Sequence, residues 1–111
     1  MDVKTEPRGQ VMIVSIIGSL DATTSQALTN SLSTFINAGN VHLVIDLSAL
    51  DFTSSAGLRA LLGALKDCRS KNGDLRIAAV QKEVRKVMEL SGFTSILKFF
   101  NTVAEGVASF V

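Results

Sequence analysis

The sequence predicts a single α/β domain, residues 1–111, with a mixed, mostly parallel β-sheet, an N-terminal antiparallel hairpin and about four helices. Its length suits one compact domain, and no repeat, linker or low-complexity segment divides it. The turn residues Pro7-Arg8-Gly9-Gln10 separate two early strand-like runs, a pattern typical of a hairpin. After the hairpin, runs with helical spacing alternate with short β-branched runs, which favours parallel strands joined by right-handed crossovers.

The first half of the chain is predicted to contain the hairpin, a helix and a buried strand. The hairpin strands are Met1–Glu6 and Val11–Ile17, and Gly18-Ser19-Leu20-Asp21 ends the second. Apolar residues at helical spacing predict a helix over Thr23–Ala38. The β-branched run Val41–Leu47 predicts a buried strand, and the polar stretch after it is predicted to be a connection without regular structure.

The second half opens with the clearest helix of the chain. Its apolar positions follow an i, i+3, i+4, i+7, i+10 pattern: Leu58, Leu61, Leu62, Leu65 and Cys68. Asn72-Gly73 ends this helix. Beyond it, the patterns predict a strand over 75–80, a helix over 83–90, a strand over 97–100 and a last helix over 102–110.

Composition argues against several classes of partner. Eleven basic and ten acidic residues leave a net charge of +1, which gives no electrostatic footprint for nucleic acid or an anionic membrane. Aromatic residues make up 5% of the chain, too few for a base-stacking platform. The apolar run Val11–Ile17 is too short to cross a bilayer, and the residues before it do not resemble a signal peptide. We therefore expect a cytoplasmic protein without nucleic-acid or membrane partners.

The segment Val44–Leu62, VIDLSALDFTSSAGLRALL, is the most informative in the chain. An apolar strand ends at Asp46-Leu47, and Ser54-Ser55 stands just ahead of the strongest helix. Functional groups of α/β sheets tend to collect at the carboxyl ends of parallel strands. On position alone, the two serines are explained as helix caps, because a hydroxyl there accepts a hydrogen bond from a free backbone N–H.

Four short motifs together support a more specific interpretation. They are Phe52–Leu58 (FTSSAGL), Gly18–Asp21 (GSLD), Val44–Leu47 (VIDL) and Met88–Phe93 (MELSGF). In this combination they closely resemble the bacterial anti-sigma factor antagonists of the STAS domain family. The resemblance covers nearly the whole chain and implies a STAS fold.

The resemblance also implies a site of phosphorylation. Alignment on Gly57-Leu58 places Ser55 at the family's phosphoacceptor. Many members have Asp just before the acceptor, where this chain has Ser54, so Ser54 is an alternative acceptor. Ala56 stands where a second hydroxyl often follows, which removes a competing acceptor.

The implied partners are an anti-sigma factor with serine kinase activity and a serine phosphatase. The unphosphorylated domain would bind the anti-sigma factor and so free a sigma factor for transcription. The kinase would use the ATP and supply the phosphoryl chemistry, so the domain needs no catalytic base of its own. We expect no cofactor and no metal site. The residues expected to bind the partner are Asp21, Thr53, Ser54, Gly57 and Arg59.

Two of these residues, Thr53 and Arg59, are expected to be exposed around Ser55, and for Arg59 a solvated helix face is the commoner explanation. Asp21 and Asp46 are expected near the start of the same helix. Partner contact and loop capping explain Asp21 equally well, whereas a strand-end hydrogen bond is the simpler explanation for Asp46.

Two alternatives remain open at this level. An enzyme would need a general base beside the serine, yet the sole histidine, His42, lies at the start of a predicted strand, away from Ser55. There is no Gly-x-Ser-x-Gly elbow, Walker-type loop or cluster of metal ligands, so we expect a protein that is not an enzyme. The second alternative is a STAS module of another assembly, such as a transporter subunit, a stress-signalling scaffold or a chemoreceptor-associated module.

Overall fold

The computed structural model describes residues 1–111 and contains a six-stranded sheet. The strands are β1 (Asp2–Arg8), β2 (Val11–Leu20), β3 (His42–Asp46), β4 (Leu50–Thr53), β5 (Asp74–Ala78) and β6 (Lys98–Phe100). Their order is β1-β2-β3-β5-β6, and the short strand β4 pairs with β2.

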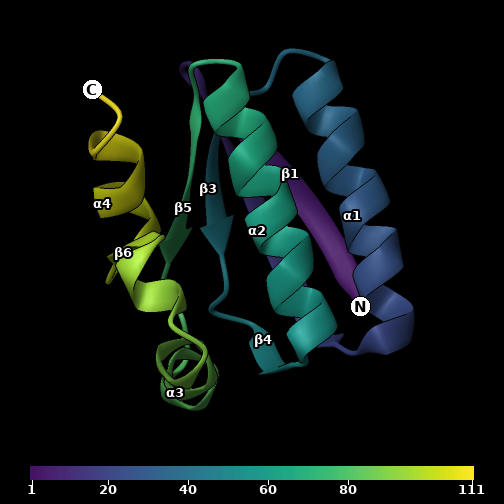
Figure 1. Ribbon diagram of the computed structural model, residues 1–111. Coiled ribbons are helices and arrows are strands. Elements are labelled where there is room, and N and C mark those ends of the chain that lie inside the picture. Colours follow the sequence, from purple (N-terminus) through teal and green to yellow (C-terminus); the bar gives the residue numbers. More distant parts are fainter.

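The predicted helices are all present. They are α1 (Ala22–Asn37), α2 (Ser55–Ser70), α3 (Lys82–Leu90) and α4 (Val103–Ala108), with a short 3-10 turn, η1 (Phe93–Ser95), between α3 and β6. Helices α1 and α2 run alongside each other over one face of the sheet (Figure 1). None of the helices combines the length and apolar character needed to cross a membrane.

The sheet has the predicted mixed topology. Strands β1 and β2 pair antiparallel with Arg8 opposite Val11, which leaves Gly9 and Gln10 as a two-residue turn. Gly9 has a φ of +63°, a left-handed conformation that glycine adopts without strain. All other strand pairs are parallel, so the hairpin is the only antiparallel pair, as predicted.

The core lies on both faces of the sheet because side chains of a strand alternate in direction. In β3, Leu43 and Ile45 join the large cluster beneath α1 and α2, whereas Val44 joins a smaller cluster beneath α4. Cys68 of α2 is fully buried in the large cluster, and burial raises the pKa of its thiol to about 11. The cysteine therefore has the packing role expected from the helical pattern.

The prediction of a connection without regular structure between β3 and α2 was wrong, because this segment contains strand β4. Gly18 of β2 lies opposite Leu50, but the next residue, Ser19, lies opposite Phe52, so β4 carries an extra residue at this point. Such a bulge changes which way the following side chains point. As a result Phe52 is exposed and Thr53 is buried.

Candidate functional site

The amino ends of α1 and α2 meet at one end of the molecule, the lower end in Figure 1. Leu20, the last residue of β2, pairs with Thr53, the last residue of β4. The backbone N–H of Ser54 donates to the carbonyl of Leu20 over 2.7 Å. These contacts bring Ser54 close to the residue that precedes α1, Asp21, as the sequence led us to expect.

The two serines at the start of α2 have different roles. Ser54 is the half-buried N-cap: its hydroxyl oxygen accepts a hydrogen bond from the backbone N–H of Gly57 over 3.3 Å. Ser55 is the first residue of the helix, is exposed, and uses its hydroxyl in no hydrogen bond with the rest of the chain. The capping explanation therefore holds for Ser54, and Ser55 presents the free hydroxyl.

Thr53 and Gly57 shape this helix start from the inside. The expected exposure of Thr53 was wrong: its side chain is 3% exposed, because the bulge in β4 turns it inward, and its hydroxyl donates to the carbonyl of Ser54. Gly57 is also buried, and a Cβ added to it would lie 2.6 Å from the Thr53 hydroxyl and 2.8 Å from the Cβ of Leu20. The first turn of α2 thus approaches the ends of β2 and β4 as closely as glycine allows.

Asp21 is the N-cap of α1. Its carboxylate accepts hydrogen bonds of 2.9 Å from the backbone N–H groups of Thr23 and Thr24, and the Thr24 hydroxyl accepts from the N–H of Asp21, which completes a capping box. The bond from the Thr23 hydroxyl and that from the Thr24 N–H lower the pKa of Asp21 to about 2. The capping explanation for Asp21 is confirmed, and the carboxylate is ionised at neutral pH.

Asp46 lies farther from this site than expected. Its carboxylate accepts from the backbone N–H of Ser48 over 3.0 Å and from the hydroxyl of Ser15 over 3.3 Å, so the strand-end explanation is confirmed. Its side chain lines a groove with Ser15 and Val103, the first residue of α4. Asp46 therefore faces the α4 side of the sheet, opposite α2, because it alternates with Ile45 along β3.

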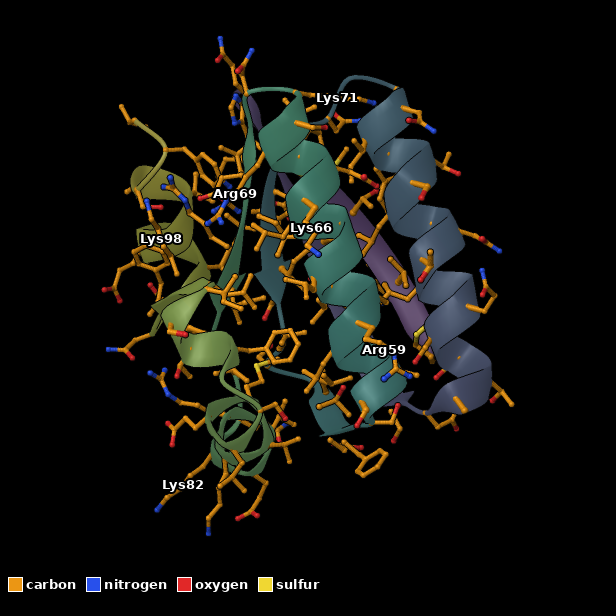
Figure 2. All side chains as sticks on the ribbon, in the orientation of Figure 1. Arg59, Lys66, Arg69, Lys71, Lys82 and Lys98 are labelled. Carbon is orange, nitrogen blue, oxygen red and sulfur yellow. The ribbon has the colours of Figure 1, made fainter.

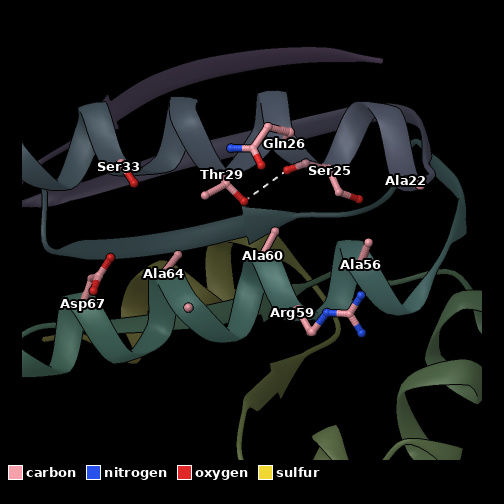
Figure 3. A pocket seen from close by; sticks show the side chains of 11 residues that line it. Ala22, Ser25, Gln26, Thr29, Ser33, Ala56, Arg59, Ala60, Ala64 and Asp67 are labelled. Carbon is pink, nitrogen blue, oxygen red and sulfur yellow. Dashed lines mark hydrogen bonds between the residues drawn. The ribbon is translucent and has the colours of Figure 1, made fainter.

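Arg59 is exposed, as expected, one helical turn beyond Ser55. It stands at one end of a groove of about 320 Å³ between α1 and α2, with Asp67 at the other end (Figure 3). Ala60 and Gly63 of α2 and Gln26 of α1 contribute to the lining. The groove opens beside the start of α2 and extends the surface that the two helices share.

Sequence reasoning missed three exposed apolar side chains on elements at the same end. Phe52 is 51% exposed on β4, and α3, which lies beside β4, carries Val87 and Leu90 at 37% and 84% exposure (Figure 1). The aromatic residue was part of the recognised motif, but its exposure follows from the bulge in β4. Large apolar side chains exposed near one end of a domain are candidates for a protein-binding surface.

His42 lies away from Ser55, as predicted. It begins β3, at the opposite end of that strand from Asp46, and its ring centroid is 5.3 Å from that of Phe110. The imidazole of His42 is therefore not in a position to act as a general base for the Ser55 hydroxyl. No group of three or more His, Cys, Asp or Glu side chains lies close enough together to hold a metal ion.

The STAS domain family model matches residues 2–106 of the chain. The chain belongs to the STAS domain family. Its curated relatives include BtrV of Bordetella bronchiseptica, a candidate anti-sigma factor antagonist that is 33% identical over 90% of this chain and 86% of the relative. An anti-sigma F factor antagonist of Paenibacillus polymyxa is 28% identical over 91% of this chain and 87% of the relative. The identification of this STAS domain with the anti-sigma factor antagonists is therefore confirmed.

Solved structures confirm the fold. A candidate anti-sigma factor antagonist from Thermotoga maritima matches with a TM-score of 0.91 at 19% identity, over 96% of this chain and 92% of the other. The antagonist SpoIIAA in its unphosphorylated form matches with a TM-score of 0.84 at 21% identity, over 98% and 96%. A sulfate transporter family protein from Wolinella succinogenes matches at 0.79 and 17% identity, over 92% and 85%, so this STAS fold also serves other assemblies.

Proposed function

We propose that this anti-sigma factor antagonist is switched by phosphorylation of Ser55. In the unphosphorylated state it binds an anti-sigma factor that is also a serine kinase, and this binding frees a sigma factor. The observation that carries the proposal is the free, exposed hydroxyl of Ser55 beside a neighbour, Ser54, whose hydroxyl caps the helix. The names of the curated relatives support the kind of partner.

The start of α2 suits an added phosphate. A phosphoserine carries about −1.5 to −2 charges at neutral pH. At the first residue of α2 this charge would lie beside the free backbone N–H groups and the positive end of the helix dipole. The fold should therefore tolerate the phosphate, in keeping with the resemblance to SpoIIAA in both its phosphorylated and unphosphorylated forms.

The phosphate would act on the docked partner instead of the fold. A partner seated over the start of α2 would cover Ser55 together with the exposed apolar side chains of Phe52, Val87 and Leu90. Burying a phosphate whose charge is not fully neutralised in such an interface would cost several kcal/mol, and about 1.4 kcal/mol already weakens binding tenfold. Steric blockage adds to this effect, so the switch needs no large conformational change.

The predicted partner-binding residues then divide into two groups. Arg59 and Asp21, both exposed, and the half-buried Ser54 would face the partner directly. Thr53 and Gly57 are buried and would act by holding the first turn of α2 in position. The kinase would supply ATP and the phosphoryl chemistry, and a separate serine phosphatase would reset the switch.

The proposal is tested by incubating the domain with its candidate kinase and ATP and mapping the modified residue by mass spectrometry. We expect one phosphate on the wild type and on Ser54→Ala, and none on Ser55→Ala. Modification of Ser54 alone would move the switch by one residue. A domain that stays unmodified by a kinase active on another substrate would refute the phosphorylation switch.

A pull-down distinguishes this role from that of a STAS module in another assembly. Ser55→Ala should retain the anti-sigma factor, and Ser55→Asp should bind it more weakly, because aspartate supplies part of the charge of a phosphate. Phe52→Ala is a second probe, since it removes exposed apolar area without changing charge. If no anti-sigma factor is retained by the wild type, the domain serves a different assembly.

A further inference from the structure

Arg59 is a cation without an anion. Every other arginine of the chain forms an ion pair with a carboxylate: Arg8, Arg69, Arg76 and Arg85. Arg59 is exposed and forms no ion pair or hydrogen bond within the domain. Asp21, at the neighbouring helix start, forms no ion pair with Arg59, and its Oδ1 accepts the hydrogen bonds from Thr23 and Thr24.

Arg59 brings a positive charge close to the amino end of α2. The first turn of that helix contains no acidic residue. The helix dipole disfavours a positive charge at the first turn, and its effect fades beyond that turn. In Figure 3 the guanidinium of Arg59 nevertheless extends along the helix toward its amino end, beside Ala56. An anion at the start of α2 would therefore relieve an unfavourable interaction.

The spacing brings Arg59 within reach of Ser55. Residues four apart on a helix are neighbours, with Cβ atoms about 5–6 Å apart. The forked guanidinium of arginine can donate two parallel hydrogen bonds to the oxygens of a phosphate. We propose that Arg59 is the positioning residue for the phosphoryl group on Ser55, which it pairs with and holds along the surface of α2.

This inference rests on the proposed phosphorylation of Ser55 and describes how the phosphorylated state is built. Pairing with Arg59 fixes the direction of the phosphoryl group toward the groove between α1 and α2. The phosphate then occupies the partner surface instead of moving freely in solvent. The domain itself thus supplies a cation that binds its own phosphoserine.

The test uses phosphoserine inserted at position 55 during translation, so that no kinase is needed. The second ionisation of the phosphate is followed by ³¹P NMR in about 0.1 M salt for four versions of the domain: wild type, Arg59→Gln, Arg59→Lys and Lys66→Gln. Lys66 is an exposed cation on the same helix, farther from the amino end in Figure 2. It lies about 16 Å from Ser55 along the helix axis, beyond a Debye length of about 10 Å at 0.1 M salt, and is the matched control.

We expect the phosphate pKa to be lower in the wild type than in Arg59→Gln by about half a unit, because a nearby cation favours the dianion and exposure weakens the pair. Lys66→Gln should titrate like the wild type, and Arg59→Lys should fall between. The difference should shrink in about 1 M salt, where the Debye length is about 3 Å.

Equal titration of Arg59→Gln and the wild type would overturn the pairing, as would an equally large change in Lys66→Gln. This outcome is separate from that of the proposed function. If kinase mapping finds no phosphate at Ser55, the switch fails whatever the NMR titration shows. If the titration shows no pairing, phosphorylation at Ser55 can still block the partner.

Discussion

The amino ends of α1 and α2 lie side by side, yet the two helices are capped by different kinds of side chain. The N-cap of α1 is a carboxylate, Asp21, held by a capping box that lowers its pKa to about 2. The N-cap of α2 is a neutral serine, Ser54, with a single 3.3 Å hydrogen bond. At neutral pH the first helix therefore carries a negative charge at its positive end, and the second does not.

This difference shows how a helix end without an acidic cap can accommodate a phosphorylated side chain. At α1 the backbone N–H groups and the dipole are already satisfied by Asp21. At α2 the cap uses one hydroxyl, and the next residue, Ser55, keeps its own hydroxyl free. A phosphate on Ser55 would place a negative charge at the amino end of α2, as Asp21 already does at the amino end of α1.

The largest effect on stability is expected at Gly57, where the first turn of α2 packs closely against the ends of β2 and β4. Gly57→Ala should destabilise the domain by about 1–3 kcal/mol, because its Cβ would press on Thr53 and Leu20. Gly63 lies on the same helix with open space at its Cβ position, so Gly63→Ala should stabilise by about 0.5–1 kcal/mol. Urea unfolding measures both. Equal stability of the two variants would mean that α2 is not held tightly against β2 and β4.

A smaller effect is expected at the start of α1, and it should depend on pH. The pKa of Asp21 lies at about 2, below its ordinary value of 3.8. A carboxyl with a depressed folded pKa stabilises the fold above its unfolded value and loses that contribution as the pH falls toward the folded one. Asp21→Ala should therefore lower the melting temperature at pH 7, and the difference from wild type should shrink between about pH 4 and pH 2.

Thermal unfolding at a series of pH values checks this prediction. Asp51, an exposed carboxylate on β4, provides the control, since Asp51→Ala removes the same charge without removing a cap. A gap between Asp21→Ala and wild type that stays constant down to pH 2 would contradict the capping role of the carboxylate.

The smallest effects separate the two serines. Ser54→Ala removes the N-cap of α2 and should cost about 0.5–1 kcal/mol, the low end for a cap because its hydrogen bond is long. Ser55→Ala removes a hydroxyl without a partner and should leave stability within about 0.5 kcal/mol of wild type. Chemical denaturation of both proteins tests the division of roles, and a larger loss in Ser55→Ala would reverse it.

Most of the fold could be predicted from the sequence because its elements have strong periodic patterns. The leucine spacing of α2 and the β-branched run of β3 depend only on local sequence and burial. Strand β4 has four residues and a bulge, so its two exposed residues, Asp51 and Phe52, are adjacent instead of alternating. The alternation that identifies a strand was therefore absent.

The candidate site was predictable only where it depends on local sequence. Motif resemblance placed Ser55 at the helix start, which is a local property of the chain. The burial of Thr53 depends on pairing between β4 and a distant strand, β2, and on the register of that pairing. The direction of Asp46 likewise depends on which face of the sheet each helix covers. Such contacts between distant segments leave no local pattern.

The central claim is that a phosphate on Ser55 controls binding of the anti-sigma factor. The most direct measurement is the affinity of one purified anti-sigma factor for the unmodified domain and for the domain with phosphoserine inserted at position 55. We expect the phosphorylated domain to bind at least about tenfold more weakly, a loss of about 1.4 kcal/mol, with both domains equally folded. Equal affinity of the two forms would contradict the account.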